Sequence, residues 1–165
     1  MKSTCPLSSA WKWRECTDMN VKEIKEDKKQ FLPLLLLADE QESMIDRYID
    51  RGTMYVLDDN GIKCECVITD EGEGVLEIKN IATEPEDQGK GYARALIDFI
   101  AMKYKRTHFI LQVGTGDSPL TVPFYERCGF VRSHHIKNFF LDNYNHPIYE
   151  CGVRLVDMIY LRKEL

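Results

Sequence analysis

The 165-residue sequence has little positive charge for its size. Its 27 Asp and Glu residues outnumber its 22 Lys and Arg residues, and the formal net charge is −5. Proteins that bind nucleic acid usually carry a basic excess, so the composition argues against nucleic acid as a partner. Any charged partner or substrate is therefore expected to be cationic.

Long apolar runs are also missing. The longest, Leu34 to Ala38, is far shorter than the stretch of about 20 residues that spans a bilayer. The first residues do not combine a positively charged start with an apolar run and a small-residue cleavage site. These absences predict a soluble, cytoplasmic protein with no membrane partner.

The six cysteines have irregular spacing. Cys64 and Cys66 form the one close pair, and no second Cys or His pair lies at the spacing of a zinc site. We therefore expect reduced structural thiols and no metal.

Hydrophobic periodicity predicts one α+β domain over residues 19–165, preceded by an N-terminal extension over residues 1–18. Asn60-Gly61 is a strong hairpin signal within an antiparallel meander. A strand–helix–strand order after the meander implies a parallel pair. The expected strands are 19–24, 53–57, 62–69, 75–82, 108–113, 130–136 and 154–161, and the expected helices are 30–38, 44–51, 91–105 and 121–128. The span 137–152 is expected to be an aromatic loop.

A glycine-bearing loop connects the third strand of the meander to the following helix. It runs from Gln88 to Ala93, with glycines at positions 89 and 91. Unused backbone amides and the helix dipole make such a helix start suitable for a pyrophosphate. A GxG alone fits equally a helix start that needs flexible residues. The segment is not a Walker A loop, which needs a glycine, four further residues and then Gly-Lys-Ser/Thr. It is not a Rossmann fingerprint either, because that pattern needs a third glycine where Arg94 stands.

Two motifs together resemble the GNAT superfamily of N-acetyltransferases. Residues Gln88 to Ala93 match the loop pattern Gln/Arg-x-x-Gly-x-Gly/Ala, and Phe124 to Phe130 resembles the Tyr-bearing helix before a Gly-Phe turn. The resemblance covers residues 21–161. It implies a GNAT-like fold, with a central mixed, mostly antiparallel sheet flanked by helices, and acetyl-CoA as cosubstrate.

The resemblance also implies roles for individual residues. Tyr125 would protonate the leaving CoA thiolate, although a packed aromatic is the alternative. Ser118 occupies the place where relatives carry an Asn that contacts CoA. The Ile81 amide would stabilise the oxyanion, and Lys90 would add a mobile charge. The other expected cofactor contacts lie at the strand end and in the loop: Ile81, Ala82 and Thr83, and Gln88, Gly89, Lys90, Gly91, Tyr92 and Ala93.

Glu77 is the candidate base, because some relatives carry a catalytic Glu at this place. Strand alternation would put Glu77 on the same face as Ile81. It could act directly or through water. The alternatives are a salt bridge with Lys79, a solvated carboxylate, or deprotonation by water alone.

The acceptor would be a primary amine on a small molecule or a protein. The aromatic segment 138–150, with its two acids, could hold a cationic amine, but a packing loop or a homodimer contact fits equally. The acidic residues Asp39, Glu40, Glu42 and Asp46 are interpreted as solvated surface. A non-catalytic CoA-binding module on the same fold is the alternative function.

Overall fold

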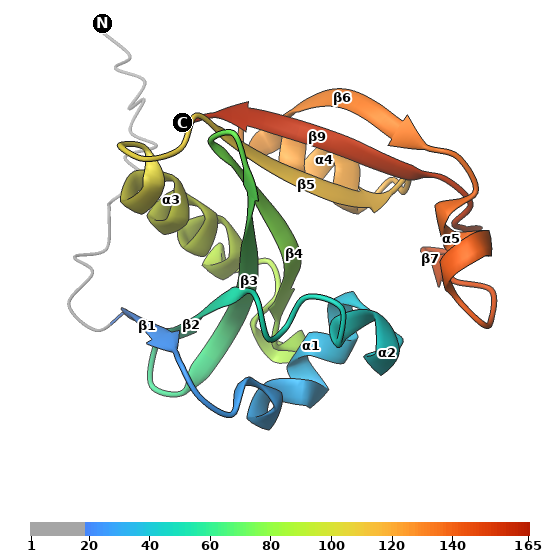
Figure 1. The fold of residues 1–165 in the computed structure, drawn as a ribbon. Helices are drawn as coiled ribbons and strands as arrows, with labels where there is room; N and C mark the ends of the chain where they lie inside the picture. Colours follow the sequence, from blue (N-terminus) through green and yellow to red (C-terminus); the bar gives the residue numbers. More distant parts are fainter. Residues whose placement is uncertain (1–18) are drawn as a thin grey trace, which may run out of the picture.

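The computed structural model describes residues 19–165, so the expected extension over residues 1–18 lies outside the described part of the chain. Seven strands form one sheet in the order β1-β2-β3-β4-β5-β9-β6 (Figure 1). Their bounds are β1 Asn20–Ile24, β2 Thr53–Asp58, β3 Ile62–Gly72, β4 Val75–Thr83, β5 Ile110–Gly116, β6 Val131–Ile136 and β9 Met158–Glu164. Only β4 and β5 pair in parallel, and the remaining neighbours are antiparallel. The predicted mixed, mostly antiparallel sheet is confirmed.

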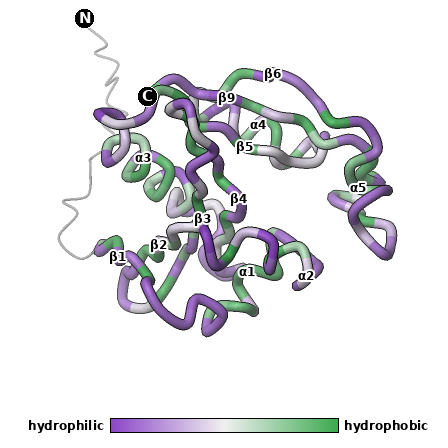
Figure 2. Tube along the Cα trace, in the orientation of Figure 1, coloured by the Kyte–Doolittle hydropathy of each residue, from purple (hydrophilic) through white to green (hydrophobic). Residues whose placement is uncertain are grey.

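Helices cover both faces of the sheet. Figure 1 shows α3 on one side of β2–β4, and α1 and α2 on the other. The helices are α1 Leu32–Ala38, α2 Glu42–Ile45, α3 Tyr92–Tyr104, α4 Thr121–Arg127 and α5 Phe139–Asn143, with short 3-10 turns η1 Lys28–Phe31 and η2 Pro85–Asp87. Hydrophobic and hydrophilic residues alternate along α3 (Figure 2), and its Leu96, Ile97 and Ile100 are completely buried. The amphipathic pattern thus orients α3 against the sheet.

Three predicted elements differ from the structure. The second helix covers only residues 42–45 before the chain turns into β2, and the last strand begins at Met158 rather than at residue 154. The expected loop 137–152 contains α5 and strand β7 (Tyr149–Glu150), which pairs with β8 (Val153–Arg154). Within residues 19–165 we find no helix with the length and hydropathy needed to cross a membrane.

The parallel pair of strands separates halfway along its length. Pairing between β4 and β5 runs from Val75–Ile110 to Ile78–Val113 and then stops, although β4 continues to Thr83. The second half of β4 therefore has one edge without a neighbouring strand, and a cavity opens there.

A β-bulge shifts the side-chain alternation of β4. Val67 of β3 pairs with Asn80 and the next residue, Ile68, pairs with Ile78, so Lys79 is the extra residue. Ile78 and Ile81 both pack in the core beneath α3, which puts Glu77 on the opposite face of the sheet. The prediction that Glu77 shares a face with Ile81 is wrong, because a bulge breaks the period of two.

Candidate active site

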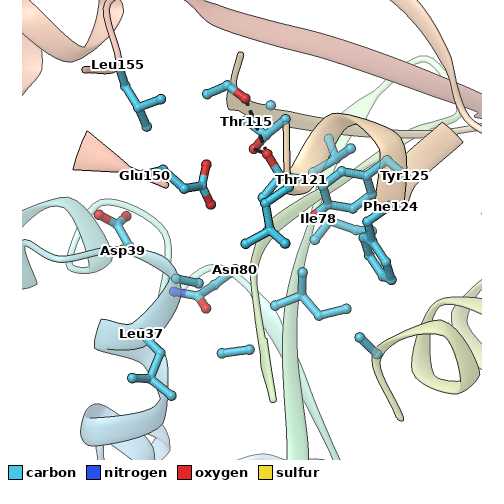
Figure 3. A pocket seen from close by; sticks show the side chains of 18 of the residues that line it. Leu37, Asp39, Ile78, Asn80, Thr115, Thr121, Phe124, Tyr125, Glu150 and Leu155 are labelled. Carbon is cyan, nitrogen blue, oxygen red and sulfur yellow. Dashed lines mark hydrogen bonds between the residues drawn. The ribbon is translucent and has the colours of Figure 1, made fainter. Parts of the chain in front are cut away.

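The main cavity, of roughly 570 Å³, lies in the gap between β4 and β5. Figure 3 shows its wall, with Ile78, Phe124 and Tyr125 on one side and Asp39 and Glu150 on the other. A smaller cavity of roughly 270 Å³ lies at the start of α3. The two share Thr83, Gln88, Gly89, Ala93, Phe124 and Arg127 as wall residues, so they form one continuous path.

The predicted loop has the geometry of an anion site. Gly89 and Gly91 have φ of +77° and +89°, and a Cβ added at either position would meet nothing within 4 Å. The first backbone bond of α3 runs from the amide of Ala95 to the carbonyl of Gly91, at 3.0 Å. The amide dipoles of the preceding turn therefore point toward the loop, where they favour negative charge.

The charge at this loop is arranged differently from the expectation. Lys90 pairs with Asp87 at 2.9 Å, and Asp87 also pairs with Lys63 at 3.3 Å. The hydrogen bond from Lys90 lowers the pKa of Asp87 below its usual range. Sequence reasoning missed two cations that line the smaller cavity, Arg94 and Arg127. The available signal was the position of Arg94 directly after the loop motif and that of Arg127 within the Phe124 to Phe130 motif.

The end of β4 lies beside this loop. Ile81, Ala82 and Thr83 all line the main cavity, past the point where β5 leaves the strand. The side-chain amide of Gln88 donates to the carbonyl of Thr83 at 3.3 Å, which ties the loop to the strand. Of the predicted loop residues, Gln88, Gly89 and Ala93 line the main cavity with this strand end, Gly91 and Tyr92 line only the smaller cavity, and Lys90 lines neither.

Tyr125 projects from α4 into the cavity wall. It is 6% exposed, and its ring packs edge-on against Phe124 and Phe130 at centroid distances of 5.1 and 5.6 Å. Burial raises the pKa of the Tyr125 phenol above its usual range, and the nearby charge of Glu150 acts in the same direction. The phenol therefore keeps its proton at neutral pH.

Ser118 is occupied within its own turn. Its hydroxyl accepts hydrogen bonds from the amides of Leu120 and Thr121, both at 3.2 Å, and so organises the start of α4. Ser118 is buried and lies outside the walls of the two cavities. A contact between Ser118 and a cofactor stays a prediction.

Glu77 lies in a buried polar cluster of β4, β5 and β9, and it does not line either of the two cavities. Its Oε1 accepts from Lys79 at 2.7 Å and from the hydroxyl of Tyr160 at 3.2 Å, while its Oε2 accepts from Gln112 at 2.7 Å. The salt bridge with Lys79, one of the alternatives, is thus present. Three donors already hold this carboxylate.

The far end of the cavity is acidic and aromatic. Asp39, Glu40 and Glu150 line it together with Phe140 and Tyr144. The interpretation of Asp39 as solvated surface is wrong, because both of its carboxylate oxygens accept hydrogen bonds from tyrosine hydroxyls. Sequence reasoning missed it because those tyrosines come from other segments.

Comparisons with known proteins agree with this geometry. The family model described as Acetyltransferase (GNAT) domain matches residues 50–132. A curated relative, an uncharacterized N-acetyltransferase of Bacillus subtilis (strain 168), is 31% identical over 144 residues, which cover 86% of this chain and 93% of the relative.

Two solved structures show the fold with its cosubstrate. A GNAT family acetyltransferase from Elizabethkingia anophelis with acetyl-CoA bound has a TM-score of 0.85 and 33% identity, covering 90% of this chain and 99% of that one. A Bacillus subtilis acetyltransferase in complex with CoA has a TM-score of 0.81 and 28% identity, covering 90% and 99%. The predicted fold and the acyltransferase class are confirmed, and the chain belongs to the GNAT family of acetyltransferases.

Proposed function

We propose that this protein transfers the acetyl group of acetyl-CoA to a primary amine, by direct attack while both substrates are bound. One observation carries the proposal. A continuous cavity runs from the anion-binding loop, through the gap between β4 and β5, to an acidic and aromatic end. This arrangement suits an anionic cosubstrate at one end and a cationic amine at the other.

The cofactor half of the cavity supports acetyl-CoA through the backbone and two cations. The amides of residues 88–93 would hold the pyrophosphate, and Arg94 and Arg127 are placed to contact further phosphate oxygens. The free edge of β4 at Ile81–Thr83 would hydrogen-bond the pantetheine arm as an added strand would. The Ile81 amide would then stabilise the thioester oxyanion.

With the two substrates bound in this way, acetyl transfer would proceed in the following steps. The neutral amine nitrogen attacks the thioester carbonyl carbon, the carbon–sulfur bond breaks, and the thiolate takes a proton from Tyr125. The buried phenol is suited to this step because it stays protonated until a strong base develops beside it.

The proton lost by the amine has two candidate receivers. Glu77 stays a predicted base, and it would act through water because Lys79, Gln112 and Tyr160 already occupy it. Glu150 lies in the cavity wall, close enough that its charge affects the pKa of Tyr125. We favour Glu150 on this placement.

The first experiment is a thermal-shift titration with acetyl-CoA, CoA, NAD and ATP in parallel. A ligand that binds only the native state raises the melting temperature. Selective stabilisation by acetyl-CoA and CoA is expected, followed by CoA thiol release with a panel of primary amines. Stabilisation without thiol release from any amine would favour the alternative, a non-catalytic CoA-binding module. Cytoplasmic location and a homodimer stay predictions.

A further inference from the structure

A directed chain of hydrogen bonds connects the sheet to the cavity at Asp39. The Asn80 amide nitrogen donates to the carbonyl of Leu35 at 3.0 Å and to the hydroxyl of Tyr48 at 2.9 Å. Tyr48 donates to one carboxylate oxygen of Asp39 at 3.3 Å, and Tyr144 donates to the other at 2.8 Å. A carbonyl can only accept, so the orientation of Asn80 is fixed, and Tyr48 must direct its own proton to Asp39.

The two tyrosine hydrogen bonds of this chain favour the ionised form of Asp39. Each of its oxygens accepts one hydrogen bond, and ionised carboxylates are the acceptor-only form. Burial raises the pKa of Asp39, which means that its charge costs desolvation energy. Tyr48 and Tyr144 offset part of that cost. They also fix the carboxylate in space, because each oxygen is held by a tyrosine from a different segment.

Asp39 has no cationic partner in an ion pair within residues 19–165. Arg47 favours the charged form of Asp39 through a longer-range electrostatic interaction. Its guanidinium donates a hydrogen bond to Asn143 at 3.0 Å. The adjacent Glu40, by contrast, faces His146 at 3.6 Å. A fixed, half-buried carboxylate beside a cavity is therefore left to be neutralised by a ligand.

The other charges on the cavity wall leave this end acidic. Lys79 is paired with Glu77 at 2.7 Å, and Arg127 belongs to the cofactor end. Glu150 adds a second carboxylate on the same side of the cavity as Asp39 (Figure 3). Phe140 also lines this cavity. Aromatic faces beside carboxylates suit an alkylammonium group.

The reacting amine is a poor ligand for Asp39. Figure 3 shows Asp39 and Tyr125 on opposite sides of the cavity, with Glu150 on the side of Asp39 but nearer to Tyr125 in this view. The leaving thiolate must lie beside Tyr125, so the attacking nitrogen also belongs on that side.

We propose that Asp39 is a specificity-determining residue that binds a second positive group of the acceptor, which makes the acceptor a diamine or polyamine. This inference rests on the proposed acetyltransferase function. It assigns the two ends of one acceptor molecule to two different carboxylates, with Asp39 anchoring one ammonium group and Glu150 facing the nitrogen that reacts.

The test compares acceptors that differ only in the second charge. Thiol release is measured with straight-chain α,ω-diamines of three to six carbons and with the monoamine of each length. The expected kcat/KM is at least roughly tenfold higher for the best diamine than for its monoamine. Asp39→Asn should abolish this preference by raising KM for the diamine far more than KM for the monoamine. Tyr144→Phe, which removes one of the two donors, should reduce the preference in part.

Asp46→Asn is the matched control, because Asp46 is an exposed carboxylate that pairs with Lys29 at 2.6 Å. It should leave the preference intact. The inference would be overturned if no diamine reacts faster than its monoamine. It would also be overturned if the preference survives in both Asp39→Asn and Tyr144→Phe. Failure of the proposed function is distinguishable, because then no amine in the wider panel releases thiol even though acetyl-CoA binds.

Discussion

The two halves of the cavity are built in different ways. The proposed cofactor half is built mainly from one continuous segment, from Ile81 at the end of β4 to Arg94 in α3, with Phe124 and Arg127 added from α4. The acceptor half uses side chains from segments far apart in sequence, such as Asp39 and Tyr144, which are 105 residues apart. A shared cosubstrate suits a backbone cradle, whereas acceptor choice depends on side chains that can change without altering the fold.

The largest effect is expected at the backbone cradle. Gly91→Asp adds a side chain at a φ of +89° and places a carboxylate where the pyrophosphate would lie. We expect CoA affinity to fall by about 100-fold, or about 2.7 kcal/mol. Isothermal titration with CoA measures this directly.

Gly72→Asp is the control for strain. Gly72 has a φ of +83° and equally open surroundings, but it lies in the β3–β4 turn, at the far end of β4 from the loop. It should lose stability and keep CoA affinity. Equal affinity losses in both variants would mean that strain, and not the loop, explains the effect.

The next effect concerns Tyr125, where the two halves meet. Tyr125→Phe should lower kcat by about 100-fold while CoA affinity stays within a factor of two, because only the proton donor is lost. The raised pKa of Tyr125 predicts that the wild-type enzyme does not lose this acid near pH 10, the ordinary value for a tyrosine. Unchanged turnover across the pH range would exclude Tyr125 as the acid.

Tyr104→Phe is the matched hydroxyl deletion. The Tyr104 hydroxyl bonds that of Tyr55 at 2.9 Å beneath α3, away from the cavity. It should change stability and leave kcat unaffected.

The difference between the two halves of the cavity also explains which parts of the site the sequence could predict. The loop at Gln88–Ala93 and the Tyr125 helix are local patterns, so their residues and spacing were visible along the chain. The bulge at Lys79 and the tyrosines around Asp39 depend on pairing between distant segments. A single sequence carries no direct signal for such contacts, and the strand period alone placed Glu77 on the wrong face.

A smaller effect on turnover separates the two candidate bases. Glu150→Gln should lower kcat by about tenfold and weaken the dependence of kcat on pH, because a carboxylate in the cavity is lost. Glu77→Gln should mainly reduce the free energy of unfolding, by roughly 1–3 kcal/mol, since Lys79 loses its buried partner. The pH–rate profiles and denaturant titrations of both variants measure this. The reverse outcome, a turnover loss confined to Glu77→Gln, would restore Glu77 as the base.

The smallest effect on turnover is expected at Glu65, a second buried carboxyl on the same face of the sheet as Asn80. Glu65 is completely buried, and within residues 19–165 its carboxyl oxygens and Oδ1 of Asn80 have no hydrogen-bond partner. Glu65 pairs with Ala82 across the β3–β4 ladder and Val67 pairs with Asn80, which makes Glu65 and Asn80 diagonal neighbours. A protonated Glu65 could therefore donate to Asn80 and extend the chain that ends at Asp39.

Burial raises the pKa of Glu65 well above its ordinary value of 4.5, and the nearby amide of Ala82 opposes this only in part. A raised folded-state pKa means that the contribution of Glu65 to stability is complete below pH 4.5 and is lost as the pH rises toward the folded-state pKa. Glu65→Gln, whose amide can donate to Asn80 at any pH, should match the wild type in acid and become the more stable protein as the pH rises. Denaturant titrations between pH 4.5 and 8 measure the difference, with turnover unchanged. A difference that stays constant over this range would show that Glu65 is not held neutral by the fold, and the chain to Asp39 would then begin at Asn80.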